Sequence, residues 1–175
     1  MSVFASDYFK DTYSCEEMRS VFCDEGLFGS WLEVEVALAK VQAKLSLIPE
    51  SAAMAIKSAA KLENLDLPKL KEDYRKIGFP ILPLLKQLSE SCDSEVSKYL
   101  HWGATTQDII DTGLVLQMRD GIKIILADLD EIISSLADLT RKHRNTVMVG
   151  RTFQQHAAPI TFGYKTAVWL DELMR

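Results

Sequence analysis

The sequence has few of the residues that build disulfide frameworks, metal sites or membrane spans. Its 175 residues include three cysteines, and Cys15, Cys23 and Cys92 lack the paired spacing of zinc ligands. No uncharged apolar run approaches the roughly 20 residues of a membrane helix, and the N-terminal residues lack the pattern of a secretory signal. We therefore expect a cytoplasmic protein without disulfides and without a membrane partner.

An excess of positive charge is also absent. The formal net charge is -5, and lysines and arginines are scattered among acidic residues, which argues against a nucleic-acid partner. The one basic cluster, Arg141 to Arg144, lies where a predicted helix end would favour cations. Because the chain offers neither ligand spacing nor a glycine-rich phosphate loop, we expect no metal and no organic cofactor.

Strand patterns are nearly absent too, since no convincing stretch alternates strictly between apolar and polar residues. Apolar residues instead recur every three or four positions, so the predicted fold class is all-α. Helices are predicted after a capping box Ser14-x-x-Glu17, from about Asp24 to a stop at Pro49, from a cap at Asp66 to Gly78, and from Ile81 to about Cys92. The second of these has the apolar set Leu27, Phe28, Trp31, Leu32, Leu38, Val41 and Leu45.

A far longer helix is predicted from about Gln107 to Arg144, where no proline interrupts the pattern. At ~1.5 Å per residue it would be roughly 55 Å long, well beyond the typical ~11 or 12 residues. Its main apolar stripe is Ile110, Leu114, Met118, Gly121, Ile125, Leu129, Ile132, Leu136 and Leu139. Such a helix needs neighbours along its length. We therefore predict a small helical N-terminal domain, residues 1–104, leading into long helices of a central bundle, residues 105–175.

The start of this long helix carries the best indication of chemistry. Thr105 and Thr106 place two hydroxyl groups beside backbone amides that lack helical partners, which suits a bound carboxylate. His101 lies just before them. The structural alternative is that Thr105-x-x-Asp108 is a capping box, with Asp in place of the usual Glu or Gln.

A second polar span lies between apolar helical segments. It contains Arg151, Thr152, Gln154, Gln155 and His156, and another helical pattern starts near Pro159. Polar connections are common, so this span alone is as compatible with a structural loop as with a binding site.

The two spans together resemble the fumarase/aspartase superfamily. HWGATTQDIIDT at 101–112 is followed by GRTFQQHAAPITFG at 150–163, and MRSVFCDEGLFGSWLEVEVALAKVQAKLSLIPE near the front extends the resemblance to essentially the whole chain. Within the superfamily, the chain is most similar to the branch of 3-carboxy-cis,cis-muconate cycloisomerase.

The resemblance implies an all-helical homotetramer that forms or cleaves a C–N or C–O bond beta to a carboxylate of a small polycarboxylate substrate. The reaction passes through a carbanion stabilised as an aci-carboxylate, which requires hydrogen-bond donors, a base and an acid. Carried over by motif, Thr105, Thr106, Thr152 and Gln155 would contact substrate. Arg151 would add charge or form a structural salt bridge, and His101 and His156 are the two candidates for the general acid.

Phe153 distinguishes the branches of the superfamily. Adenylosuccinate lyases and fumarases carry a histidine there, whereas bacterial cycloisomerases tend to carry an aromatic residue and place a histidine where His156 stands. The family's flexible loop with the serine that resembles the general base would lie beyond residue 175. We therefore expect these residues to be the first part of a longer enzyme and to be inactive alone.

Two alternatives remain open at this point. One is an adenylosuccinate lyase-like enzyme. The other is a noncatalytic oligomerisation module, in which the long helix only brings subunits together.

Overall fold

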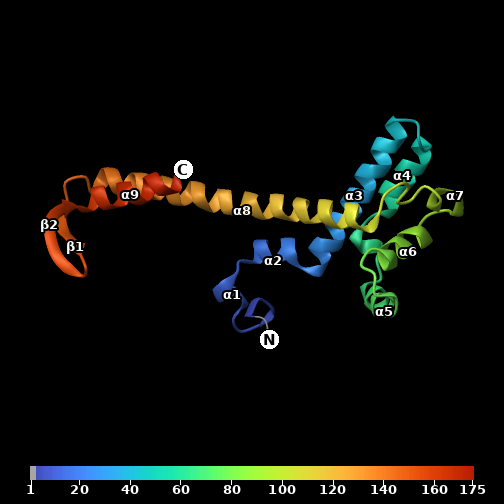
Figure 1. Ribbon diagram of the computed structural model, residues 1–175, viewed down its shortest axis with the longest axis horizontal. Coiled ribbons are helices and arrows are strands. Elements are labelled where there is room, and N and C mark those ends of the chain that lie inside the picture. Colours follow the sequence, from blue (N-terminus) through green and yellow to red (C-terminus); the bar gives the residue numbers. More distant parts are fainter. Residues whose placement is uncertain (1–2) are drawn as a thin grey trace. The chain divides into compact units, whose positions relative to one another are not determined.

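The computed structural model describes residues 3–175, which belong to two compact units, one reaching to Gly121 and the other running from Ile122 to Arg175 (Figure 1). The elements, in chain order, are η1 (Val3–Ala5), α1 (Lys10–Tyr13), α2 (Glu16–Phe22), α3 (Asp24–Lys44), α4 (Glu50–Ala59), η2 (Leu62–Asn64), α5 (Leu67–Ile77), α6 (Leu82–Glu90), α7 (Ser94–Ser97), α8 (Thr106–Lys142), β1 (Val147–Thr152), β2 (Gln155–Thr161) and α9 (Phe162–Leu173). The all-α class is confirmed, with the short hairpin β1–β2 as an addition that the sequence patterns did not predict.

Helix ends follow local hydrogen bonding, and two of the predicted caps on α5 are present. The Asp66 carboxylate accepts a hydrogen bond from the Lys69 amide at 3.0 Å, and Gly78 ends α5 with φ 70°. The capping box predicted at Ser14 is wrong. The Ser14 amide instead donates to the Lys10 carbonyl and so ends α1, while Cys15 occupies the N-cap of α2.

The helix α3 begins as predicted but ends before Pro49. The Cys23 thiol accepts a hydrogen bond from the Gly26 amide at the N-terminus, and the helix stops at Lys44, where Ser46 turns the chain with φ 59°. Pro49 serves as the N-cap residue of α4. The prediction that Pro49 stops α3 is therefore wrong, because the turn at Ser46 has already reversed the chain.

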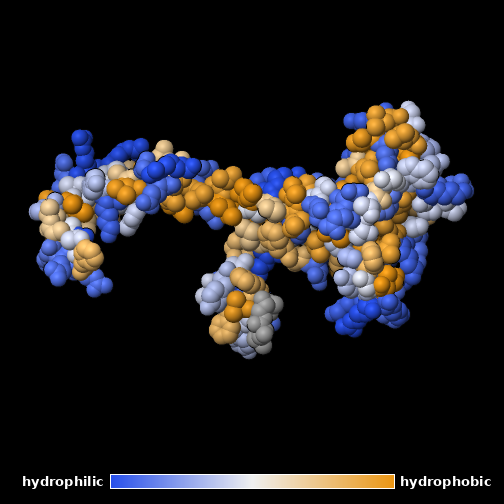
Figure 2. Space-filling model, in the orientation of Figure 1, coloured by the Kyte–Doolittle hydropathy of each residue, from blue (hydrophilic) through white to orange (hydrophobic). Residues whose placement is uncertain are grey.

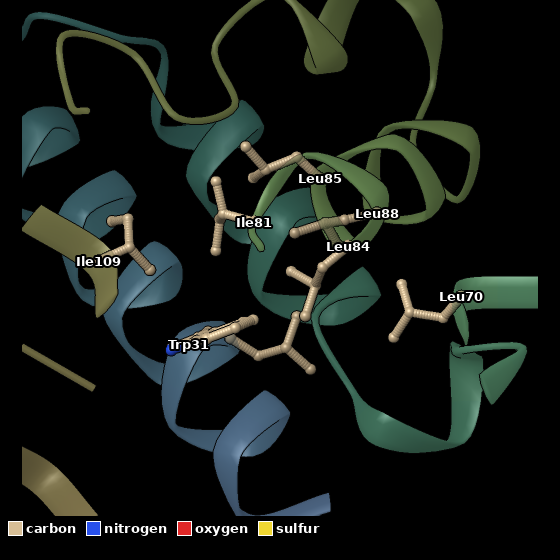
Figure 3. Packing of buried hydrophobic residues seen from close by; sticks show 8 residues of the cluster. Trp31, Leu70, Ile81, Leu84, Leu85, Leu88 and Ile109 are labelled. Atoms are coloured by element: carbon tan, nitrogen blue, oxygen red, sulfur yellow. The ribbon is translucent and has the colours of Figure 1, made fainter. Parts of the chain in front are cut away.

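The first unit is built around two adjoining apolar clusters. Figure 3 shows side chains of the larger one, which joins α3, α5, α6 and α8 through Trp31, Leu32, Leu70, Ile81, Leu84, Leu85, Leu88 and Ile109. The smaller one joins α3 to α4 through Ala39, Ile48, Ala53 and Ile56, with Tyr99 and Leu100 packed against it. Both clusters use the same buried face of α3.

That buried face differs from the predicted apolar set in the second half of α3. Val41 and Leu45 are exposed, whereas Glu35 and Gln42 are buried. Glu35 and Gln42 therefore extend into the interior of the first unit, where they contact the segment that precedes α8.

The helix α8 confirms the long rod predicted from about Gln107 to Arg144. Its buried residues are Ile109, Gly113, Gln117 and Gly121, spaced four apart, whereas residues of the predicted stripe such as Leu114, Met118, Ile125 and Ile132 are about half exposed. Figure 2 shows apolar surface along α8. Over residues 3–175, no helix is both long and apolar enough for a membrane span.

The second unit contains the end of α8, the hairpin and α9. The Phe162 amide donates to the Thr146 carbonyl and the Gly163 amide to the His143 carbonyl, each at 2.9 Å, and the Thr140 and Thr166 hydroxyls lie 2.9 Å apart. These bonds fasten the start of α9 to the end of α8. The helix predicted near Pro159 is present as α9, but it begins at Phe162, because Pro159 itself pairs with Val149 inside the hairpin.

Candidate functional site

The N-terminus of α8 presents hydroxyl groups and free amides, as a carboxylate site would require. Thr105 is exposed and Thr106 is half-buried. Within residues 3–175, the backbone N–H groups of Thr106 and Gln107 have no hydrogen-bond acceptor. These donors and the positive end of the helix dipole together favour a bound anion.

One half of the predicted capping box is formed at the same place. The Asp108 carboxylate accepts a hydrogen bond from the Thr105 amide at 2.9 Å, and the Thr105 carbonyl accepts from the Asp108 amide at 3.1 Å. Asp108 thus satisfies one donor and brings a negative charge to the helix end. An incoming carboxylate would have to use the remaining donors, at Thr106, Gln107 and the two threonine hydroxyls.

His101 is held in an unusual position just before α8. Its backbone has φ 55°, a conformation that is uncommon for residues other than glycine. Its Nδ1 lies 2.6 Å from Oε1 of Glu35, which is 1% exposed on α3. Burial raises the pKa of the Glu35 carboxyl, and the hydrogen bond from His101 opposes that rise.

A second contact from α3 holds the residue after His101. The Gln42 side-chain amide donates to the Trp102 carbonyl at 2.7 Å, and the Tyr99 and Trp102 rings lie 6.5 Å apart. The segment that carries His101 is therefore fixed at two points by buried polar side chains of one helix.

The second candidate span forms the hairpin and its turn. Phe153 and Gln154 connect the strands with φ values of 47° and 64°, the positive signs that a type I′ turn requires at both central residues. Neither is the glycine or asparagine that such turns favour, so the turn holds backbone strain on the order of 1–3 kcal/mol per residue. The Phe153 ring at this turn is 97% exposed.

The register of the hairpin separates the candidate residues of this span into two pairs. Thr152 pairs with Gln155, and Arg151 pairs with His156. Cross-strand partners point to the same side of a sheet and successive residues point to opposite sides. Thr152 and Gln155 therefore share one face, and Arg151 and His156 share the other. All four are exposed.

Arg151 lies beside a small hollow between the hairpin and α9. The hollow has a volume of about 290 Å³, and Tyr164, Lys165 and Trp169 also line it. Arg151 makes no ion pair with any residue from 3 to 175, so the structural salt bridge considered for it is not present there.

The two candidate spans belong to different units, His101, Thr105 and Thr106 to the first and the hairpin to the second. A larger hollow of about 770 Å³ lies between α3 and α5 in the first unit, with Phe28 and Tyr74 in its lining. None of the seven candidate residues lines it. In the described part of the chain, no three His, Cys, Asp or Glu side chains gather as metal ligands would.

The sequence patterns missed Glu35 and Gln42. The sequence does contain a pattern that could have indicated them. Glu35 and Gln42 recur at helical spacing with Trp31, Leu32 and Ala39, so they lie on the same buried face of α3. A carboxyl group on a buried stripe requires a partner, and the partner of Glu35 is His101.

Known proteins resemble this chain over nearly all its length. Residues 11–175 match the protein family described as Lyase. An adenylosuccinate lyase from Pyrococcus abyssi is 43% identical over 100% of this chain and 38% of that protein. A 3-carboxy-cis,cis-muconate cycloisomerase from Pseudomonas putida is 42% identical over 93% of this chain and 39% of that protein.

Solved structures give the same result. The crystal structure of 3-carboxy-cis,cis-muconate lactonizing enzyme from Pseudomonas putida matches with a TM-score of 0.91 and 39% identity, over 97% of this chain and 40% of that one. The chain thus spans about two fifths of the length of these relatives. The matches confirm the resemblance found in the two polar spans: the chain belongs to the lyase family, within the fumarase/aspartase superfamily.

Proposed function

We propose that the protein carrying this chain acts on a small polycarboxylate in the manner of 3-carboxy-cis,cis-muconate cycloisomerase. The reaction would be a lactonisation, or the corresponding beta elimination, through an aci-carboxylate carbanion. Phe153 is the observation that favours the cycloisomerase branch over the others. It is exposed at the hairpin turn, at the position where adenylosuccinate lyases and fumarases carry a histidine.

Thr105 and Thr106 would bind a substrate carboxylate at the start of α8. Their hydroxyls and the amides of Thr106 and Gln107 are donors fixed by the helix, so they need no reorganisation as negative charge develops on the carboxylate. Thr152 and Gln155 would contact the substrate from their shared face of the hairpin.

His101 is the better candidate for the general acid. A ligand that meets Thr152 and Gln155 faces away from His156, because the register places His156 on the other side of the hairpin with Arg151. His101 has a fixed ring and a carboxyl partner, which is the arrangement expected of a group that transfers a proton. Arg151 and His156 would then serve in binding or charge balance.

An adenylosuccinate lyase activity is the second candidate. It is favoured by the 43% identity to the Pyrococcus abyssi adenylosuccinate lyase over the whole of this chain. The two candidates differ in substrate, so direct assays of the complete protein with 3-carboxy-cis,cis-muconate and with adenylosuccinate separate them. Turnover of carboxymuconate is expected, and activity on the purine substrate alone would refute the cycloisomerase proposal.

Substitutions at the start of α8 test whether there is a site at all. Thr105→Ala with Thr106→Ala, made in the complete protein, should lower kcat/KM by on the order of 100-fold or more without changing assembly. Thr112→Ala is the matched control, because Thr112 is an exposed threonine of the same helix. If the double variant only weakens assembly and the protein turns over neither substrate, the oligomerisation module is the better account.

We also propose that the complete protein is a cytoplasmic homotetramer and that residues 1–175 are inactive by themselves. Apolar residues left exposed along α8 support self-association. Turnover of either substrate by the purified 175-residue chain would contradict the second part of this proposal.

A further inference from the structure

The contact between Glu35 and His101 joins a buried carboxyl group to a candidate catalytic ring. Glu35 Oε1 lies 2.6 Å from His101 Nδ1, and both residues belong to the first unit. The His101 side chain is 19% exposed and that of Glu35 is 1% exposed. The imidazole therefore has one nitrogen turned to the interior while part of the ring remains open to solvent.

We propose that Glu35 is the positioning residue of His101, fixing the proton on Nδ1 and so leaving Nε2 as the nitrogen that exchanges a proton with the substrate. The effect of Glu35 on catalysis rests on the proposed function. The position of the proton on the His101 ring does not depend on that function. Glu35 touches no substrate in this role and acts only through the ring.

The location of the proton follows from the hydrogen-bonding roles of the two groups. The hydrogen bond from His101 favours the ionised form of Glu35, and an ionised carboxylate can only accept, so the ring nitrogen that faces it is the donor. A separation as short as 2.6 Å is typical of a hydrogen bond in which one partner is charged. The carboxylate then accepts from Nδ1–H, which fixes the tautomer as a carboxylate partner does in a catalytic triad.

The environment of the second carboxylate oxygen of Glu35 favours a role in positioning His101 over a role in stabilising the fold. Glu35 Oε2 is buried and has no hydrogen-bond partner within residues 3–175. A buried carboxyl group with a single partner costs free energy that an apolar residue of similar size would not. The one hydrogen bond that its side chain makes is directed at His101, a candidate for the general acid.

Gln42 provides a matched control on the same helix. It is also buried, and it binds the neighbouring residue through the Trp102 carbonyl instead of through a side chain. Loss of Gln42 should loosen the same segment without changing which nitrogen of His101 carries the proton. Comparison of two variants therefore distinguishes the two roles. Glu35→Gln tests the positioning of the His101 ring, and Gln42→Met tests the support of the neighbouring backbone.

The first test locates the proton directly. In the 175-residue chain labelled with ¹⁵N-histidine, the nitrogen chemical shifts of His101 at alkaline pH should report Nδ1–H and an unprotonated Nε2. The rings of His143 and His156 are assigned by single substitutions to glutamine. In Glu35→Gln the fraction of the Nε2–H tautomer should rise, because an amide can donate as well as accept. A wild-type ring protonated on Nε2 would overturn the proposal.

The second test is kinetic and uses the complete protein. Glu35→Gln should lower kcat by tenfold or more with a smaller change in KM, and Gln42→Met should lower kcat less than threefold. Equal losses in the two variants would assign Glu35 a purely structural role and refute the proposal. If the wild-type protein converts none of the proposed substrates, the proposed function fails while the nitrogen shifts still decide the role of Glu35.

Discussion

At the scale of single residues, Glu35 is the clearest case of a group held in an environment that disfavours its charge. Burial raises the pKa of its carboxyl above the ordinary 4.5. A carboxyl whose pKa is raised by folding stabilises the folded state below pH 4.5, where it is protonated in both states. That contribution is lost as the pH rises through its value in the folded protein.

The stability of Glu35→Gln relative to the wild type should therefore increase with pH. Near pH 4 the substitution exchanges a protonated carboxyl group for an amide of the same size, whereas near pH 7 it also relieves the cost of a buried charge. The difference in free energy of unfolding between variant and wild type should shift in favour of the variant by about 1.4 kcal/mol for each unit by which the pKa of Glu35 in the folded protein exceeds its value in the unfolded chain. Urea denaturation at the two pH values measures it.

Glu33→Gln is the control for this experiment, because Glu33 is an exposed carboxylate on the same helix. Its effect should stay within about 0.5 kcal/mol at both pH values. A pH-independent difference for Glu35→Gln would mean that folding does not raise the pKa of Glu35.

At the scale of secondary structure elements, α8 packs through its small residues and leaves much of its apolar surface exposed. A Cβ atom added at Gly113 would lie 2.6 Å from Cδ1 of the buried Trp31 ring, and one at Gly121 would lie 3.1 Å from the Phe22 ring. Between them, the Gln117 side chain donates to the Val21 carbonyl at 2.6 Å. Glycine lets α8 approach α2 and α3 closely enough for these contacts.

Gly113→Ala should consequently destabilise the first unit. Alanine favours a helix over glycine by about 1 kcal/mol, but the Trp31 ring is too well packed to move without loss of contacts. The net effect should be a decrease in the free energy of unfolding of about 1–3 kcal/mol, measured by chemical denaturation. Thr112→Ala, at the exposed preceding position, should change it by less than about 0.5 kcal/mol. A stabilised Gly113→Ala protein would show that the packing against Trp31 is looser than described.

At the scale of the whole molecule, the exposed apolar side chains of α8 require an explanation that one chain does not provide. Ile125 and Ile132 are 50% and 46% exposed. Large apolar side chains left exposed along one face of a helix are typical of interfaces. The proposed homotetramer would bury it against helices of other subunits.

Ile132→Lys should weaken self-association of the complete protein by on the order of tenfold or more, since burying an isoleucine contributes about 1.5–3 kcal/mol. Ser134→Lys makes the same change in charge at an exposed polar position of the same helix and should leave assembly unchanged. Sedimentation velocity over a range of concentrations distinguishes the two. Equal dissociation constants for both variants would place the interface elsewhere.

The sequence by itself determined the helical class, the long α8 and most of the candidate residues. These follow from local rules, because apolar periodicity predicts helices and because Asp66 and Gly78 act within one turn of their own positions. The two polar spans were sufficient to identify the family for the same reason, since each motif is continuous in sequence.

Only the tertiary structure decided the hairpin and the partner of His101. The hairpin escaped prediction because its turn uses Phe153 and Gln154 in place of asparagine and glycine, and because Pro159 reads as a helix start. The partner of His101 lies on a helix 66 positions earlier in the chain, brought close by packing of the first unit. Local patterns fix which residues form a helix, but folding over long separations fixes which polar groups are buried together.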